Sequence, residues 1–252
     1  KRTARTNWGE GALLGVGEKK LNKVGLWVTP SFLDMFEIPM QQGTARALDD
    51  PRSIVLTASL AKALFGDEDP LNKMVQVDNN LEMKVTGVTA EMPTNTAFSD
   101  YTFFIAYGHY ELTQSWVRNV KERWDNNVSQ VYVELNPGTP VAEVDDAIRK
   151  LITQNNKAID NVELFLQPMS HWRLYTNFTN GKESGGMILY VRLFTGIAIF
   201  ILVIACINFM NLATARSERR AREVGIRKSI GSRRKDLIFQ FLGESLLLAV
   251  LA

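Results

Sequence analysis

Residues 193–212 read LFTGIAIFILVIACINFMNL, and this run decides the architecture of the chain. None of its residues is charged. At a rise of 1.5 Å per residue, about 20 helical residues cover about 30 Å, the thickness of the hydrocarbon core of a bilayer. The alternative is a buried helix of a large soluble domain, but such helices are usually shorter and keep a polar stripe. The run therefore predicts a transmembrane helix over residues 188–215.

The residues that follow the run are strongly basic. The 252-residue chain carries 29 Lys and Arg against 27 Asp and Glu, and nine of the basic residues lie between Arg216 and Lys235. Because basic loops stay on the cytoplasmic side of a membrane, we expect residues 216–236 to be a cytoplasmic loop. Residues 1–187 are then extracytoplasmic, and the apolar residues 237–252 are the truncated start of a further transmembrane helix. This basic segment adjoins an apolar run, so it predicts a lipid membrane and no nucleic acid as its partner.

The sequence offers few residues for catalysis or metal binding. Cys206 is the only cysteine, and His109 and His171 are the only histidines. No nucleophile or carboxylate pattern lies near either histidine, and no G-x-x-x-x-G-K-[ST] phosphate loop is present. We therefore predict no catalytic residue, cofactor site or metal site, and leave the roles of the two histidines open. The chain starts without Met and ends in an apolar run, so we expect a piece of a longer polypeptide.

Short alternating patterns fill most of the region before the apolar run. They predict strands over residues 26–29, 53–57, 74–77, 83–88, 101–105, 128–135 and 162–166, and helices over 32–36, 60–65 and 141–152. Thr57 or Ser59 is expected to cap the second helix at its start, and Gly66 at its end. Asp78-Asn79-Asn80 predicts a hairpin turn, and residues 1–23 are expected to be irregular or the end of an element that begins before them. This mixture of hairpins and helices predicts an α+β domain rather than a doubly wound parallel sheet.

The basic segment also has a specific order of residues. Residues 222–231 read REVGIRKSIG, and residues 240–245 read QFLGES. An ordinary cytoplasmic loop accounts for the charge but not for this order, which resembles the MacB–FtsX family of ABC transporter permeases. Residues 204–216 resemble the end of the second span of that family, and residues 53–73, 85–88 and 92–95 its periplasmic core domain. The resemblance covers residues 24–252 and departs from the family pattern at Asn72 and Thr96, where Gly and Ser are common.

The resemblance implies an α+β extracytoplasmic domain of the periplasmic core domain type, attached to α-helical transmembrane segments. It implies the permease subunit of an ABC transporter in the bacterial inner membrane, with residues 1–187 in the periplasm. ATP would be bound and hydrolysed by a separate ATPase subunit, whose movements the permease relays to its periplasmic domain. Further implied partners are a second permease, in a homo- or heterodimer, and a periplasmic adaptor or effector protein. The cargo is not implied.

Two groups of residues are candidates for this function. The resemblance assigns ATPase coupling to Arg222, Glu223, Val224, Gly225, Ile226, Arg227, Lys228 and Gly231. Turns at Gly225 and Gly231 are expected to bracket a short helix that faces the partner or lipid phosphates. Asn208 and Asn211 lie three residues apart, so both amides face one side of the membrane helix and favour helix packing over a substrate role. Glu244, inside the truncated span, fits a mechanistic role or a partner for an arginine.

A membrane-anchored sensor ectodomain without a transport role is the alternative reading. It predicts a helical dimerisation and phosphotransfer segment after the basic stretch. A returning span only about 20 residues further on favours the permease instead. A tethered periplasmic enzyme would need a catalytic set, and the sequence offers no candidate for one.

Overall fold

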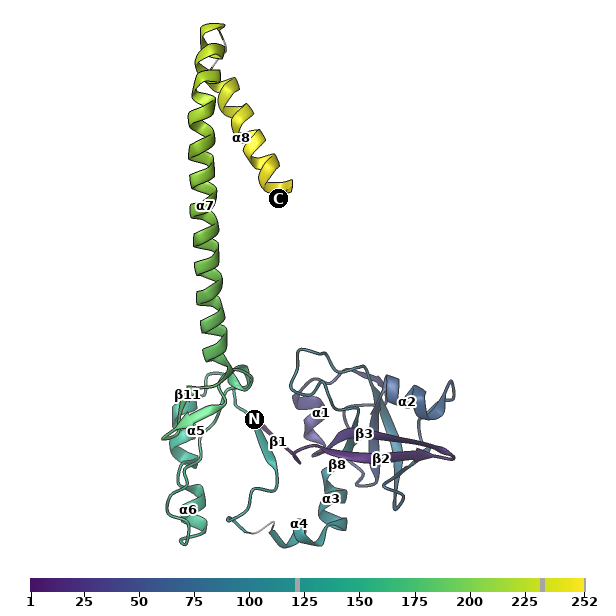
Figure 1. Ribbon diagram of the computed structural model, residues 1–252. Helices are drawn as coiled ribbons and strands as arrows, with labels where there is room; N and C mark the ends of the chain where they lie inside the picture. The colour runs from purple at the N-terminus through teal and green to yellow at the C-terminus, as the bar shows by residue number, and fades with distance from the viewer. Residues whose placement is uncertain (121–122, 232–233, 252) are drawn as a thin grey trace. The chain divides into compact units, whose positions relative to one another are not determined.

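The computed structural model describes residues 1–120, 123–231 and 234–251. Two compact units are present, Lys1–Ser170 and His171–Ala252, and each is described by itself (Figure 1). The first unit is built on a mixed β-sheet, and the second consists of a short hairpin and two helices.

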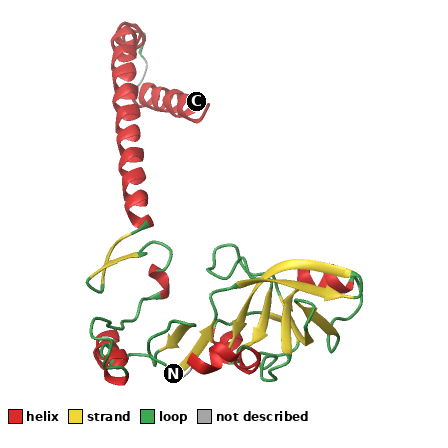
Figure 2. Ribbon diagram, turned by 60° about the horizontal axis from the view of Figure 1, so that its bottom comes forward, coloured by secondary structure: helices red, strands yellow, loops and turns green. Residues whose placement is uncertain are grey.

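The first unit contains one sheet of nine strands. The strands are β1 (Arg2–Thr6), β2 (Glu10–Val16), β3 (Lys19–Val28), β4 (Met40–Gln42), β5 (Ser53–Thr57), β6 (Met74–Val77), β7 (Leu81–Thr89), β8 (Phe103–Ala106) and β9 (Gln130–Glu134). Neighbours follow the order β2-β6-β7-β5-β8-β3-β1-β9, and β2 also pairs with β3. The second pairing of β2 closes a ring from β2 through β6, β7, β5 and β8 to β3, and Figure 2 shows these strands in yellow. Only β3–β8 and β5–β7 pair in parallel among the described strands, so the α+β prediction is confirmed.

The helices of the first unit are α1 (Ser31–Met35), α2 (Ala58–Phe65), α3 (Tyr107–Thr113), α4 (Ser115–Val120), α5 (Val141–Ile148) and α6 (Leu151–Asn155). Helices α1, α2 and α3 contact strands of the sheet. On one face, Leu60 of α2 packs in a cluster with Ile54 and Leu56 of β5. On the other face, the ring of Phe104 in β8 lies 5.7 Å from that of Phe32 in α1. Both central strands are therefore buried on both sides, which agrees with their continuous apolar sequences.

The expected helix caps of α2 are partly confirmed. Gly66 ends the helix with a φ of 68°, and its N–H donates to the carbonyl oxygen of Lys62 at 2.8 Å. Thr57 occupies the N-cap position but makes no side-chain capping hydrogen bond. The carboxylate of Glu91 accepts from the N–H of Ser59 at 2.6 Å instead. A free N–H at the start of α2 is thus satisfied by Glu91, which is distant in sequence, and not by a hydroxyl next to the helix start.

The prediction that residues 1–23 are irregular is wrong. They form β1, β2 and the start of β3, and seven residue pairs join β2 to β3 from Glu10↔Gly25 to Val16↔Lys19. Leu14 is fully buried, while Ala12 and Val16 pack against the same core cluster. This alternation is typical of a strand, but the glycines and lysines around it weaken the pattern in the sequence. The pairing with β3 stabilises the strand in the structure.

Two predictions at the end of the first unit also need correction. The single helix expected over residues 141–152 is interrupted between α5 and α6, and neither helix buries a residue. Residues 162–166 form no strand. The N–H of Leu164 donates to the carbonyl oxygen of Arg149 at 3.1 Å, and that of Leu166 to the carboxylate of Asp145 at 2.7 Å. Their donors are satisfied by the neighbouring helix, so no partner strand is needed.

The second unit begins with a hairpin and continues with two helices. The elements are η1 (Met169–His171, which overlaps the unit boundary), β10 (Asn177–Thr179), β11 (Lys182–Gly185), α7 (Met187–Ser229) and α8 (Arg234–Leu251). Asn180 and Gly181 join the two strands with φ values of 52° and 71°. Two positive φ values in succession are the geometry of a type I′ turn, for which Asn-Gly is the strongest sequence signal. This hairpin was not predicted, although its signal is present in the sequence.

Candidate functional site

The long helix α7 is the central element of the candidate site. Within the part of the chain that the structure describes, Met187–Arg216 is the one helical stretch long and apolar enough to cross a membrane. It has 30 residues, and an 18-residue window within it has a mean hydropathy of 2.6 and is not buried by the protein. Phe200, Ile204 and Met210 are each at least 65% exposed. An apolar surface of this extent needs an apolar environment, which a bilayer provides.

Polar side chains in this stretch are accommodated by the helix itself. The hydroxyl of Thr195 donates to the carbonyl oxygen of Val191 at 2.7 Å, and that of Thr214 to Met210 at 2.9 Å. Such bonds satisfy a hydroxyl where no water is available. Asn208 and Asn211 are both exposed on α7, so their amides are accessible to another helix. Their role in helix packing stays a prediction.

The segment expected to be a cytoplasmic loop is mostly helical. Helix α7 continues without interruption through Ser229, and residue 225 lies inside it. The predicted turn at Gly225 is therefore wrong, because one glycine costs a helix only about 1 kcal/mol and the good helix formers Glu223 and Arg227 lie two residues away on either side. Gly231 does adopt a positive φ, 95°, where the chain reverses toward α8. Ser232 and Arg233 lie outside the described residues.

The chain reversal presents apolar and basic side chains together. Ile226 and Ile230, one helical turn apart, are 57% and 79% exposed. Lys228 is also exposed, Val224 and Arg227 are partly buried, and the backbones of Arg222 and Glu223 lie in α7. The side chains of Arg222 and Glu223 lie outside what the structure describes.

One hydrogen bond ties α8 to the end of α7. The guanidinium of Arg227 donates to the side-chain oxygen of Gln240 at 3.0 Å, across the reversal that Figure 1 shows. Glu244 lies about one turn further along α8 and is exposed. The assignment of residues 237–252 to a further membrane span stays a prediction, as does the role of Glu244.

The opposite end of α7 is fastened to residues 171–186, which we call the hairpin segment. The N–H of Ile188 donates to the carbonyl oxygen of Leu174 at 3.0 Å. Gly186 has φ 127° and ψ −147°, and a Cβ there would lie 2.6 Å from the backbone nitrogen of Thr176. Only glycine fits such a backbone conformation and such a contact. Gly186 is therefore the residue that lets the hairpin segment pack against the first turn of the helix.

A side-chain pair closes the hairpin segment. Nδ1 of His171 lies 2.7 Å from Oε1 of Glu183. Because a carboxylate only accepts, the imidazole donates through Nδ1. The ring of His171 also packs on Tyr175, with centroids 4.7 Å apart. The sequence left the role of His171 open, and the structure shows a positioning contact inside the hairpin segment.

His109 lies in the core of the first unit. Its ring stacks on Trp27 with centroids 6.0 Å apart, and its Nε2 is buried without a hydrogen-bond partner among the described residues. Burial lowers the pKa of His109, and the positive charge of Arg52 lowers it further. Nearby, burial and the carboxylate of Glu10 raise the pKa of Tyr110 to about 12. His109 and Tyr110 are both buried in this core.

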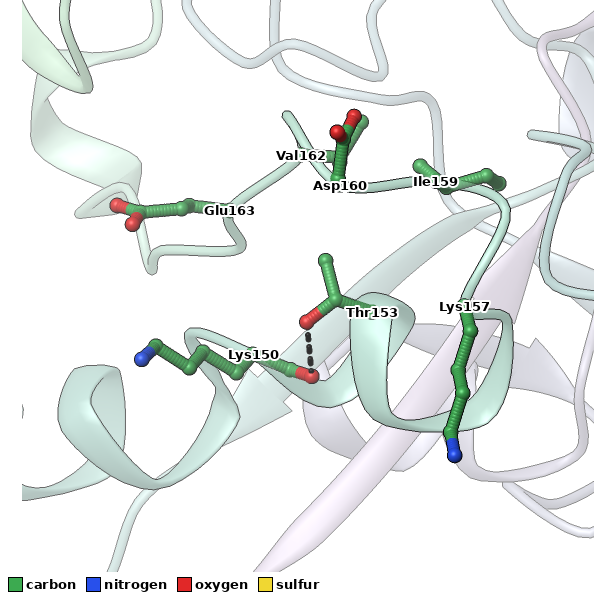
Figure 3. Close-up of a pocket in the computed structure, with 7 residues that line it drawn as sticks. All are labelled: Lys150, Thr153, Lys157, Ile159, Asp160, Val162 and Glu163. Carbon is green, nitrogen blue, oxygen red and sulfur yellow. Dashed lines mark hydrogen bonds between the residues drawn. The ribbon is translucent and has the colours of Figure 1, made fainter.

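A shallow pocket at the end of the first unit has no convergent chemistry. It is lined by Lys150, Thr153, Lys157, Ile159, Asp160, Val162 and Glu163. Figure 3 shows the two lysines pointing away from each other, while the hydroxyl of Thr153 donates to the carbonyl oxygen of Lys150. Within the described residues, no group of three or more His, Cys, Asp and Glu side chains could hold a metal ion. The structure therefore directs attention to α7 and its two ends.

Comparison with known proteins gives matches along most of the chain. Residues 3–151 match the model of the MacB-like periplasmic core domain, and residues 195–252 match that of the FtsX-like permease C-terminal segment. The second match runs through the chain reversal to the end of the chain, which argues against the sensor alternative.

Similar proteins include two curated bacterial relatives. A probable export ATP-binding/permease protein of Pseudomonas fluorescens is 25% identical over 96% of this chain and 35% of its own length. The macrolide export ATP-binding/permease protein MacB of Bdellovibrio bacteriovorus is 25% identical over 78% of this chain and 28% of its own length. The chain thus spans about a third of the relatives that it matches.

A solved structure supports the fold. It is a domain of a protein from Porphyromonas gingivalis assigned as a permease, with a TM-score of 0.54 and 20% identity. The match covers 67% of this chain and 79% of that domain.

Proposed function

Because the chain belongs to the permease family with a MacB-like periplasmic core domain and an FtsX-like permease segment, we propose that it is the permease subunit of an ABC transporter. Residues 1–187 lie in the periplasm, and α7 crosses the bacterial inner membrane. The chain reversal after α7 lies in the cytoplasm, where basic residues are retained. The fold match and the apolar surface of α7 support this proposal.

The observation that carries the proposal is the continuity of α7. Its 43 residues make a rod of about 65 Å, against about 40–45 Å for a bilayer with its headgroups. One end is fastened to the hairpin segment, and the other extends about 20 Å beyond the apolar stretch to the reversal at Gly231. A continuous helix transmits a displacement of one end to the other. The function proposed is mechanotransmission, in which ATP hydrolysis outside this chain moves the periplasmic domain.

We propose that the reversal binds an ABC ATPase through Ile226 and Ile230, with Arg227 and Lys228 beside them. Exposed apolar side chains next to basic ones are typical of a surface that binds a partner protein. The sequence resemblance favours a separate ATPase subunit. The names of the relatives join ATP binding and permease in one protein, and co-purification of an untagged ATPase with the tagged chain distinguishes the two arrangements. A second permease and a periplasmic adaptor complete the proposed partners.

A proline substitution tests the relay. Ala221 lies in the part of α7 beyond the apolar stretch and is exposed. Ala221→Pro removes a helix hydrogen bond and costs about 3 kcal/mol of helix stability, whereas Ala221→Leu keeps the helix. The full permease, with Cys206→Ser and a spin label on Thr179→Cys, would be studied in vesicles with its ATPase. We expect trapping with ATP and vanadate to change the label spectrum in the parent protein and Ala221→Leu, but not in Ala221→Pro.

The outcomes separate the parts of the proposal. An unchanged spectrum in the parent protein, with the ATPase bound and active, rules out the relay. A normal response in Ala221→Pro shows that rod continuity is not needed. For topology, an impermeant thiol reagent should reach Asn180→Cys in intact cells but not Ser229→Cys. Labelling of both positions from outside contradicts the single crossing.

A further inference from the structure

The hairpin segment lies directly against the first turn of α7. The N–H of Leu189 donates to the carbonyl oxygen of Gly186 at 3.1 Å, next to the bond from Ile188 to Leu174. Pairing of β10 with β11 and the contact between His171 and Glu183 hold the segment together. Its depth relative to a membrane is therefore set by the depth of the helix start.

The length of α7 gives the depth of the helix start. Residues 193–212 are uncharged and cover the hydrocarbon core of about 30 Å. Residues 187–192 add about 9 Å on the outer side, where the headgroup layer is roughly 5–8 Å thick. Tyr190 and Arg192 then lie at the headgroup level, and the hairpin segment joins the helix at the outer edge of that layer.

The composition of this region matches that position. Residues 171–192 include four aromatic side chains, Trp172, Tyr175, Phe178 and Tyr190, and the basic residues Arg173, Lys182 and Arg192. The single acidic residue is Glu183, which is paired with His171. Phe178 and Tyr190 are 38% and 58% exposed. Rings of this kind are enriched at membrane interfaces, and arginine and lysine bind lipid phosphates there.

A groove runs between the hairpin segment and the helix. It is lined by Thr176, Asn177, Gly186, Met187, Leu189, Tyr190 and Leu193. Its polar side belongs to the start of β10 and its apolar side to α7. This division suits an amphipathic molecule whose polar end faces the periplasm and whose apolar end faces the bilayer.

We propose that residues 171–192 form an interfacial element that inserts into the headgroup layer of the outer leaflet and holds a phospholipid in this groove. The inference rests on the proposed membrane crossing by α7. Continuity with the spanning helix favours a lipid over a second copy of the chain, because the first turn of α7 already lies in the headgroup layer.

Spin-label depth measurements test the proposal on the full chain in vesicles of phosphatidylethanolamine and phosphatidylglycerol. In the Cys206→Ser background, one label is placed at Thr179→Cys, beside Phe178, and another at Leu202→Cys in the middle of the span. Accessibility to oxygen and to a water-soluble nickel complex reports depth. We expect the label at position 179 at the phosphate level, and the label at 202 near the bilayer centre.

Substitution of the inserted rings supplies the second measurement. Phe178→Ser with Tyr190→Ser should shift the label at position 179 into water, whereas Leu112→Ser, an exposed apolar residue of α3, should not. A label at 179 in water while 202 is in lipid overturns the inference alone. A label at 202 in water overturns the proposed crossing. Protection of 179 from both reagents means that a protein covers the segment, which also overturns the inference.

Discussion

Replacement of Gly186 by alanine should release the hairpin segment from α7. The glycine adopts φ 127° and ψ −147°, and an added Cβ would lie 2.6 Å from the nitrogen and 2.7 Å from the hydroxyl of Thr176. It would also lie 2.8 Å from the carbonyl oxygen of Leu174, which accepts the hydrogen bond from Ile188. The substitution therefore adds backbone strain and disrupts the hydrogen bond from Ile188 to Leu174, which holds the hairpin segment against α7.

The magnitude follows from these two effects. A side chain held in this backbone region costs about 1–3 kcal/mol. Loss of the hydrogen bond between Ile188 and Leu174 costs about 1 kcal/mol net. A local destabilisation of about 2–4 kcal/mol corresponds to a reduction of roughly 30- to 1,000-fold in the equilibrium constant between the closed and the open segment.

Hydrogen exchange measures this equilibrium constant. In vesicles, the peptide covering residues 171–190 should lose protection by that factor, while the strands of the first unit keep theirs. Gly196→Ala is the matched control, because it lies in α7 with no atom within 4 Å of the added Cβ. If Gly186→Ala keeps the protection of the parent protein, the packing argument for this junction is refuted.

Three other predictions concern single residues. Gly225→Ala should keep ATPase binding and slightly stabilise α7, because alanine is the better helix former. Gly231→Ala should weaken ATPase binding, because a side chain at φ 95° strains the chain reversal. Equal co-purification of the ATPase with the two variants would contradict this prediction. Gly25→Ala should destabilise the first unit by about 1–3 kcal/mol in urea-dependent pulse proteolysis, because its Cβ would lie 2.3 Å from the ring of Phe103. The neighbouring strand supplies a control in Gly11→Ala, and equal losses would contradict that prediction. Burial lowers the folded-state pKa of His109, so its contribution to the free energy of unfolding is present above the unfolded pKa of about 6.5 and is lost as pH falls through the folded value. His109→Phe should therefore reduce the difference in the free energy of unfolding between about pH 7.5 and about pH 5. An unchanged difference would count against this assignment.

Local patterns in the sequence were enough for several elements. The apolar run of residues 193–212 is helical because backbone groups in lipid must bond within their own segment. The β-branched run of β5 and the hairpin at Asp78 and Asn79, with φ values of 52° and 57°, depend on residues that are adjacent in the chain. The order of residues 222–231 was enough to indicate the permease family, because a motif is itself a local pattern.

Features of the candidate site that join distant residues required the tertiary structure. The pairing of His171 with Glu183 and of Arg227 with Gln240 joins residues 12 and 13 positions apart across chain reversals. In the sequence Gly186 looks like an ordinary loop glycine, and only the structure shows that Leu174 and Thr176 occupy the space that a Cβ there would need. By contrast, the glycine at 225 predicts a turn, whereas the structure places it inside the continuous helix α7. The sequence by itself determined which residues are apolar enough to enter a membrane, since composition sets the cost of transfer from water. Only the tertiary structure decided how the ends of that helix are held, because close approach and hydrogen bonding depend on residues that folding brings together.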